Sequence, residues 1–339
     1  MAPSTDTSTA AVQLLQMMTG YWVSQGVYVA AKLGIADHLA TGPVHYEDLA
    51  RKTNTHALSL YRTLRALASV GVFAEINAGQ FALTPIAGLL QSNVPNSMRA
   101  LAIMYCEEQY RAWGDLLQSV RTGEPAFDRQ FGMGVFEYFS QNPEAGTIFN
   151  EAMTNWTTQA SAAVAASYDF SHASSIVDVG GNQGTLIETI LRQYPTARGI
   201  LFDRPHVVST AEDRLAKAGV GDRCRIVGGD FFASVPSDGD AYLLSYVLHD
   251  WDDERCVAIL ARCRQAMPAT GTLLVIEMVL PESNEPSFGK WLDLHMLVMS
   301  SGRERTAEQY RMLLQAGGFD LTRVIPTPAG SSIVEARPA

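Results

Sequence analysis

Apolar residues recur at helical spacing through the first half of the chain and form short uninterrupted runs in the second half. In the first half, this spacing predicts three helices, which cover residues 11–39, 45–54 and 56–71. The first of them is expected to break at Gly34. Residues 72–85 then alternate between apolar and polar positions around a polar turn, which predicts a β-hairpin.

Two short helices followed by a small hairpin are typical of a winged helix-turn-helix. This motif often binds DNA, so a ligand-sensing regulator is one hypothesis. The second short helix offers only Arg62 and Arg65 as strong phosphate or base contacts, and a net charge of −10 lacks the basic footprint that nucleic acid requires. Winged helices also serve as dimerisation modules. The sequence therefore favours a homodimer, in which the apolar first helix packs against a second copy, and no nucleic-acid partner.

From Ser175 onward, runs of β-branched and aliphatic residues alternate with helical stretches. These runs cover residues 175–181, 198–205, 223–232, 240–250 and 271–281. Strands that alternate with helices predict a parallel sheet, and continuous apolar runs predict that helices cover both faces of that sheet. We therefore predict an α/β fold with a Rossmann-like, doubly wound core.

The two halves define the predicted domain organisation. Residues 1–95 are expected to form a mostly helical winged-helix domain. Residues 96–339 are expected to form the α/β domain, with a helical linker over 96–170 and the Rossmann-like core over 171–339.

The composition agrees with a globular protein that has a sizeable core, because 47% of the 339 residues are hydrophobic and 18% are charged. The first ten residues are small and polar, and we expect them to be mobile. No apolar run approaches the ~20 residues of a membrane span, and no signal peptide is recognisable. The four cysteines form no CxxC pair and favour free thiols in a cytoplasmic protein.

A glycine-rich turn, GGNQG over 180–184, follows the first predicted strand. Ligands of such sheets bind at the carboxyl ends of the strands, and glycine lets the backbone approach them closely. Asn182 tolerates left-handed geometry and can keep the shape of the turn. Asp178 precedes the turn, where its charge opposes a pyrophosphate but suits a cation such as S-adenosylmethionine. Arg204 keeps the 2′-phosphate of NADP as an alternative, although the spacing GxGxxG is absent.

Acidic residues also end the next two predicted strands. Asp203 can accept hydrogen bonds from the ribose hydroxyls of an adenosine-containing cofactor. Asp230 can accept one from the adenine amino group, with Phe231 against the face of the ring. A role as helix caps is the alternative for each carboxylate, but their places at successive strand ends favour a ligand site.

His249 follows the fourth predicted strand and can act as a general base, because an imidazole titrates near neutral pH. Glu277 lies in an apolar strand, where a carboxylate needs a partner. Either Glu277 or Glu304 can accept a hydrogen bond from the imidazole, although Glu304 can equally be a charge at the start of a helix. The acidic residues 252–254 suggest either a metal site or the first turn of a helix, and we favour the helix.

The motifs DVGGNQG, FDRP, GDFF, LHDWDDE and RERTAEQYRMLLQAGGF occur in this order after the winged-helix region. Together they resemble the small-molecule O-methyltransferases of the plant caffeic acid type and their bacterial natural-product relatives. The resemblance runs from about residue 12 to residue 335. It implies a class I methyltransferase core and an N-terminal winged-helix dimerisation domain, whose first helices reach into the partner's active site.

The resemblance also implies S-adenosylmethionine as cofactor, S-adenosylhomocysteine as product, no metal, and His249 as the base between Glu277 and Glu304. The residues expected to bind the cofactor are Thr157, Asp178, Gly180, Gly181, Asp203, Arg204, Asp230, Phe231 and Ser245. The residues expected to bind the substrate are Met153, Trp156, Asp250, Met296 and Met299. Aromatic residues that can line the same cavity are Tyr105, Trp113, Phe127, Phe131 and Phe136.

Four positions depart from the usual pattern of the family. Asn182 replaces a glycine, Arg204 a leucine, Trp156 a histidine and Ser245 a lysine. These changes alter the cofactor rim and the pocket. The predicted reaction is methylation of a hydroxyl on a small phenolic or polyketide-like secondary metabolite. N-methylation of a heteroaromatic, and non-methylation chemistry with the same cofactor, remain alternatives.

Overall fold

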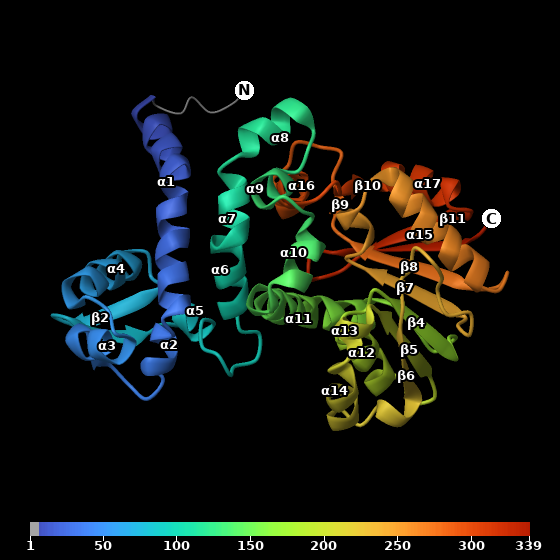
Figure 1. Cartoon of the computed structure of the whole chain (residues 1–339), viewed down its shortest axis with the longest axis horizontal. Helices are drawn as coiled ribbons and strands as arrows, with labels where there is room; N and C mark the ends of the chain where they lie inside the picture. Colours follow the sequence, from blue (N-terminus) through green and yellow to red (C-terminus); the bar gives the residue numbers. More distant parts are fainter. Residues whose placement is uncertain (1–6) are drawn as a thin grey trace. The chain divides into compact units, whose positions relative to one another are not determined.

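The computed structural model describes residues 7–339 (Figure 1). Residues 1–6 lie outside this range, and they include part of the segment 1–10 that was predicted to be mobile. The described chain divides into two compact units, one made of residues 7–110 with Glu144–Asn155 and the other of Arg111–Pro143 with Trp156–Ala339. Among the described helices, none combines the length and apolar character that crossing a membrane requires.

The first unit contains the predicted helices and hairpin. The helices are α1 (Thr7–Lys32), α2 (Ile35–His38), α3 (Tyr46–Thr53), α4 (Ala57–Ser69), α5 (Pro85–Gly88) and α6 (Arg99–Cys106). Strands β1 (Val44–His45), β2 (Phe73–Asn77) and β3 (Gln80–Leu83) form an antiparallel sheet in the order β1-β3-β2. The predicted break at Gly34 is confirmed, because this glycine has a φ of +63° between α1 and α2.

The apolar residues of α4 explain why this unit folds as it does. Leu60, Leu64 and Leu67 lie on one stripe of the helix and are buried with Phe73 and Phe81 of the hairpin. By contrast, large apolar side chains on the first two thirds of α1 stay exposed in the single chain. These are Val12, Leu14, Leu15, Met17, Met18, Tyr21, Trp22 and Val23, with exposed fractions that reach 78% at Met17.

The second unit is built on a seven-stranded sheet in the order β11-β12-β8-β7-β4-β5-β6. The strands are β4 (Ser175–Val179), β5 (Arg198–Asp203), β6 (Cys224–Gly228), β7 (Ala241–Ser245), β8 (Thr272–Glu277), β11 (Phe319–Pro326) and β12 (Ser332–Pro338). Neighbouring strands from β8 to β6 are parallel, and β12 is antiparallel to both of its neighbours. The predicted doubly wound sheet is confirmed.

Helices cover both faces of this sheet (Figure 1). The end of α11 (Pro143–Ser167) packs with α12 (Thr185–Gln193) and α14 (Ala211–Lys217) on one face. Helices α15 (Asp253–Ala266) and α17 (Ala307–Ala316) pack on the other. Shorter helices in this unit include α8 (Leu116–Thr122), α9 (Ala126–Phe131), α10 (Val135–Gln141) and α13 (Pro205–Val208).

One predicted strand is divided in two. The apolar run 271–281 forms β8 as far as Glu277, and after Met278 it forms the two-residue strand β9 (Val279–Leu280). Glu277 pairs with Ser332, the first residue of β12, so the large sheet offers no partner beyond it. Strand β9 instead pairs in parallel with β10 (Arg305–Thr306), which we call the β9–β10 pair.

The chain proceeds from β4 to β5 and β6 on one side, and returns to β7 on the other side of β4. This reversal creates the switch point at which doubly wound sheets bind their ligands, outside the carboxyl ends of the strands. The residues after β4, β5, β6, β7 and β8 meet at this edge.

Candidate active site

The glycine-rich turn runs between β4 and α12, and its backbone requires glycine at two positions. Gly180 has a φ of +72°, and its N–H donates to the Phe202 carbonyl at 2.8 Å. A Cβ added to Gly181 would lie 2.7 Å from the carboxyl carbon of Asp178. Asn182 has a φ of +52°, which confirms that it takes the left-handed geometry predicted for it.

Asp178 is a fully buried carboxylate next to this turn. Neither of its oxygens makes a hydrogen bond of normal geometry within the described chain. Burial raises the pKa of Asp178 from 3.8 to about 7, and the backbone N–H of Ile187 offsets this rise only in part. A buried, poorly paired carboxylate is costly for a protein to keep. It is the arrangement expected where a cationic ligand completes the site.

Asp203 shapes the turn from the end of β5. Its carboxylate accepts hydrogen bonds from the backbone N–H groups of Asn182 at 2.9 Å and Arg204 at 2.6 Å. Burial raises the pKa of Asp203, and these hydrogen bonds oppose the rise. The side chain of Arg204 itself is exposed.

The remaining predicted cofactor residues lie at the same edge or in α11. Asp230 is exposed two residues after β6 and accepts from the Phe232 N–H at 2.9 Å. Phe231 is half-buried and lies near the turn, since a Cβ on Gly180 would be 3.8 Å from its ring. Ser245 is the last residue of β7, and Thr157 is half-buried in α11.

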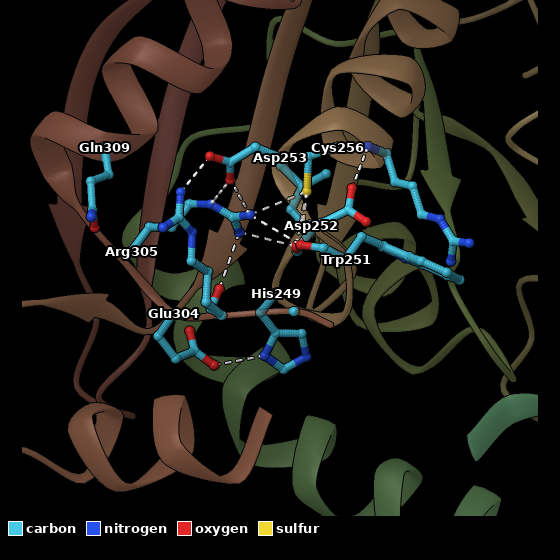
Figure 2. A network of polar contacts seen from close by, with 12 residues as sticks. His249, Trp251, Asp252, Asp253, Cys256, Glu304, Arg305 and Gln309 are labelled. Carbon is cyan, nitrogen blue, oxygen red and sulfur yellow. Dashed lines mark hydrogen bonds and ion pairs between the residues drawn. The ribbon is translucent and has the colours of Figure 1, made fainter. Parts of the chain in front are cut away.

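His249 lies in a short 3-10 turn, η2 (Leu248–Asp250), just beyond β7. Its Nδ1 is 2.7 Å from Oε1 of Glu304, as Figure 2 shows. Its Nε2 is 3.6 Å from Oδ1 of Asp250. Burial lowers the pKa of His249, but the carboxylates of Glu277, Asp250 and Glu304 outweigh it and raise this pKa to about 10.

Glu277 holds the backbone of the His249 turn, and this differs from the hydrogen bond predicted for it. Its Oε1 accepts from the backbone N–H groups of Val247 at 3.1 Å and Leu248 at 3.0 Å. Its Oε2 is 3.7 Å from Nδ1 of His249, beyond hydrogen-bond distance. Burial raises the pKa of Glu277 to about 8, although the charge of His249 opposes the rise. Glu277 therefore contributes to the electrostatics of the imidazole and to its placement.

Glu304 makes the direct contact because the β9–β10 pair places the residue just before β10 next to the His249 turn. It is 2% exposed, and its N–H donates to Oδ1 of Asp293 at 2.9 Å. The alternative, a charge in the first turn of α17, is wrong, because Thr306 caps that helix and Glu304 precedes the cap. The helix interpretation of residues 252–254 is confirmed, since Asp252 caps α15 by accepting from the Arg255 N–H at 2.8 Å.

This geometry defines what the imidazole can do. One ligand atom from each of His249, Glu277 and Glu304 lies within 4.8 Å of the others, a spacing that a metal ion also tolerates. However, the short contact with Glu304 is a hydrogen bond, which requires a proton on Nδ1. With Nδ1 protonated, Nε2 is the nitrogen that accepts or returns a proton. The arrangement therefore suits acid–base chemistry at Nε2.

An apolar cluster lies beside the imidazole. Met278 is buried with Leu292 and Met296 of α16 (Phe288–Met299), and Trp156 and Tyr246 pack against them. The Tyr246 ring lies 5.6 Å from the His249 ring. Of the predicted substrate residues, Trp156, Met296 and Asp250 thus gather near His249. Met299 is buried three residues farther along α16. Met153 belongs to the first unit, and its role stays a prediction.

Two polar residues near this cluster were not predicted as a pair. The indole N–H of Trp113, at the end of α7 (Glu108–Trp113), donates to Nδ1 of His295 at 2.9 Å. Burial, together with the charge of His249, lowers the pKa of His295 to about 4. His295 is therefore neutral, with its proton on Nε2, because an indole can only donate. The sequence signal that could have identified His295 was the presence of a histidine within the apolar helix 288–299.

Two family models match the chain, an O-methyltransferase domain over residues 113–320 and an O-methyltransferase dimerisation domain over residues 15–93. The chain belongs to the O-methyltransferase family. This membership agrees with the predicted resemblance and with the fold of the second unit.

Curated relatives of this chain include enzymes of two kinds. A phenazine O-methyltransferase, PhzM, from Lysobacter antibioticus is 58% identical over 96% of this chain and 95% of its own length. A phenazine-1-carboxylate N-methyltransferase from Pseudomonas aeruginosa is 35% identical over 96% and 97%, respectively.

Solved structures of family members share the whole fold. The crystal structure of LaPhzM has a TM-score of 0.95 at 57% identity, and covers 97% of this chain and 99% of its own. Human N-acetylserotonin methyltransferase in complex with SAM has a TM-score of 0.91 at 28% identity, and the match covers both chains completely.

Proposed function

We propose that this protein transfers a methyl group from S-adenosylmethionine to a hydroxyl group of a small aromatic metabolite. The observation that carries the proposal is the hydrogen bond between His249 and Glu304 at the carboxyl edge of the sheet. It leaves Nε2 of the imidazole to take the proton of an acceptor hydroxyl.

The residues around the glycine turn fit S-adenosylmethionine, the cofactor of the family. Asp178 is a buried carboxylate without a strong partner, and the turn at Gly180 and Gly181 leaves no room for a Cβ. Asp203 would accept from the ribose hydroxyls and Asp230 from the adenine amino group. The cofactor supplies a methyl group on a sulfonium, which leaves as a neutral thioether.

His249 would act as the general base. A phenol has a pKa near 10, so its proton must leave as the methyl group transfers. A positioned base contributes about 10²–10⁴-fold to such a step. The imidazole shifts toward its neutral, accepting form when positive charge is added at this edge, because a nearby like charge lowers its pKa. Glu304 then stabilises the imidazolium that forms.

A hydroxyl acceptor explains the base better than a ring nitrogen does. An aromatic ring nitrogen such as that of a phenazine carries no proton, so its methylation needs no base. Here His249 is held by two buried glutamates, an arrangement that would have no purpose in that reaction. The relative named as an O-methyltransferase is also more similar, at 58% identity, than the one named as an N-methyltransferase, at 35%.

The acceptor class is proposed as a flat, hydroxylated aromatic or heteroaromatic. Two features support it, the apolar cluster beside His249 and the named substrates of the relatives, which include phenazines and 3-amino-4-hydroxybenzoate. The chain is also proposed to work as a homodimer. The family dimerisation domain and the exposed apolar residues of α1 support this arrangement.

The experiment combines binding with turnover. Calorimetric titration with S-adenosylhomocysteine and with NADPH tests the cofactor. Incubation with S-adenosylmethionine and a hydroxyphenazine, phenazine-1-carboxylate or 3-amino-4-hydroxybenzoate, followed by mass spectrometry, tests the acceptor. We expect S-adenosylhomocysteine to bind, O-methylated product to form, and His249→Ala to lose about 10²-fold or more in turnover while it still binds S-adenosylhomocysteine. Methylation at nitrogen alone, or full turnover by His249→Ala, would refute the proposal.

A further inference from the structure

A buried guanidinium spans the turn that carries His249. Arg305 in β10 is fully buried, and it follows Glu304 directly in the chain. Its Nη1 donates to the Leu248 carbonyl at 3.1 Å, and its Nη2 donates to the Trp251 carbonyl at 3.1 Å. Leu248 directly precedes His249, and Trp251 directly follows Asp250, so the two carbonyls flank this pair of residues. Figure 2 draws the contact between Arg305 and Trp251 as a dashed line.

The same guanidinium is tied to its own segment and to α15. Nη1 also donates to the Arg303 carbonyl at 3.1 Å, and Nη2 donates to Oδ1 of Asp253 at 2.8 Å. Gly302 completes the contact between the two segments, since a Cβ there would overlap the carbonyl oxygen of His249. The segment that carries Glu304 therefore lies directly against the backbone of the segment that carries His249.

Stability alone does not account for an arginine at this position. Burying a guanidinium costs several kcal/mol, and a well-packed apolar side chain in its place is often neutral or stabilising. The carboxylate of Asp253, its ionic partner, is half exposed, which weakens the pair. What arginine adds is a rigid planar fork of N–H donors, which fixes the two carbonyls in one geometry.

We propose that Arg305 is a positioning residue, which locks the His249 turn onto the Glu304 segment and so sets the contact between imidazole and carboxylate. The inference deepens the proposed function and rests on it. A misplacement of about 1 Å in a catalytic group can cost about 10²-fold in rate. Arg305 thus acts on the reaction through His249, without touching a reacting atom.

Arg303 provides a matched control. It forms an ion pair with Oδ2 of the same Asp253, but its side chain is exposed and bonds to neither carbonyl of the turn. The substitutions Arg305→Lys and Arg303→Lys both keep the positive charge and both weaken the contact with Asp253. Only Arg305→Lys removes the fork that spans the turn.

The decisive readout is the titration of His249 in the full-length protein, followed by NMR of ¹⁵N-labelled histidine without cofactor or substrate. Loss of the resonance in His249→Asn assigns it. The titratable groups that face the imidazole are Glu277, Glu304, Asp250, Tyr246 and the neutral His295. All five stay in place in Arg305→Lys, so a changed titration reports the geometry of the His249–Glu304 contact.

We expect the pKa of His249 in Arg305→Lys to fall by about one pH unit or more, as a carboxylate contact loosens. With a methyl acceptor, kcat should fall about 10–10²-fold while KM and S-adenosylhomocysteine affinity stay within about twofold. Arg303→Lys should match the wild-type protein in every measurement. The titration needs no turnover, so it decides the role of Arg305 even if no acceptor is found.

An unchanged His249 titration in folded Arg305→Lys would overturn the inference, and so would an equal change in Arg303→Lys. A lower melting temperature with unchanged titration would show a structural role only and would overturn it as well. If Arg305→Lys does not fold, Asp253→Asn takes its place, because it loosens the guanidinium without removing it. A smaller downward shift of the His249 pKa would then support the role, and no shift would overturn it.

Discussion

Replacing Asp178 by asparagine should make the ligand-free protein more stable at neutral pH. The folded chain buries this carboxylate and raises its pKa from 3.8 to about 7. Each pH unit between these values corresponds to about 1.4 kcal/mol, so ionisation of Asp178 costs the fold about 4 kcal/mol above pH 7 as an upper bound. Asparagine removes this cost but leaves a buried amide poorly paired, which costs about 1–3 kcal/mol. We expect a net gain of about 1–3 kcal/mol at pH 8.

The sign of the pH dependence follows from the raised pKa. Between pH 4 and 7 the folded state binds a proton at Asp178 that the unfolded state has lost. The free energy of unfolding of the wild-type protein therefore declines through this range, relative to that of Asp178→Asn, and stays low above it. Other titrating groups cancel when the two proteins are compared. Urea denaturation of both at pH 4.5 and pH 8, without ligand, measures the difference.

The same substitution should weaken binding of S-adenosylhomocysteine by tenfold or more in calorimetry, because the carboxylate proposed to face its ammonium group is gone. Greater stability with weaker binding is the expected signature of a group kept for its ligand. An Asp178→Asn protein that is less stable than wild type at pH 8, with a difference that does not change with pH, would refute the reasoning. The carboxylate would then have a stabilising partner in the folded chain.

Three further substitutions test the site. Glu304→Gln should lower the pKa of His249 by about one to three pH units and turnover by about 10²-fold, measured as a pH–rate profile; an unshifted profile would contradict the contact. Asn182→Ala should cost about 1 kcal/mol in denaturation, because its φ of +52° is unfavourable for alanine, while Asn182→Gly should stay close to wild type. Gly302→Ala should cost about 1–3 kcal/mol or more through overlap with the His249 backbone, whereas Gly134→Ala, with open space around it, should be nearly neutral. Equal melting temperatures for these two glycine variants would contradict the close packing.

The parts of the site that could be predicted lie at the ends of long apolar strands. Asp178, Asp203 and His249 each follow or end a strand whose pattern is clear, and the carboxyl ends of parallel strands necessarily share one edge. Glu277 was recognisable because a carboxylate inside an apolar run needs a partner. Its partner turned out to be backbone N–H groups, since the pattern of apolar residues carries no information on how a turn folds back.

The parts of the site that could not be predicted depend on contacts between segments whose apolar residues show no regular period. The two-residue strands β9 and β10 show no alternation, yet they decide that Glu304 meets His249. Arg305 looks like any charged residue near the start of a helix until its burial is known. The antiparallel pair of β11 and β12 was missed because Asp320, Thr322 and Arg323 interrupt the apolar residues of its outer strand, half of which is exposed. In each case long-range contact decides a structure that local sequence leaves open.

The β9–β10 pair has a consequence for how such enzymes diversify. Residues 281–304 connect β9 to β10, so both ends of this excursion are held by the strand pair. The excursion contains α16 and hence Met296 and His295, whereas Glu277 precedes it and Glu304 is its last residue, directly next to β10. Its interior can therefore be exchanged between homologues as a cassette, while the proton-handling residues keep their places. Acceptor preference and chemical competence are then free to evolve at separate rates within one chain.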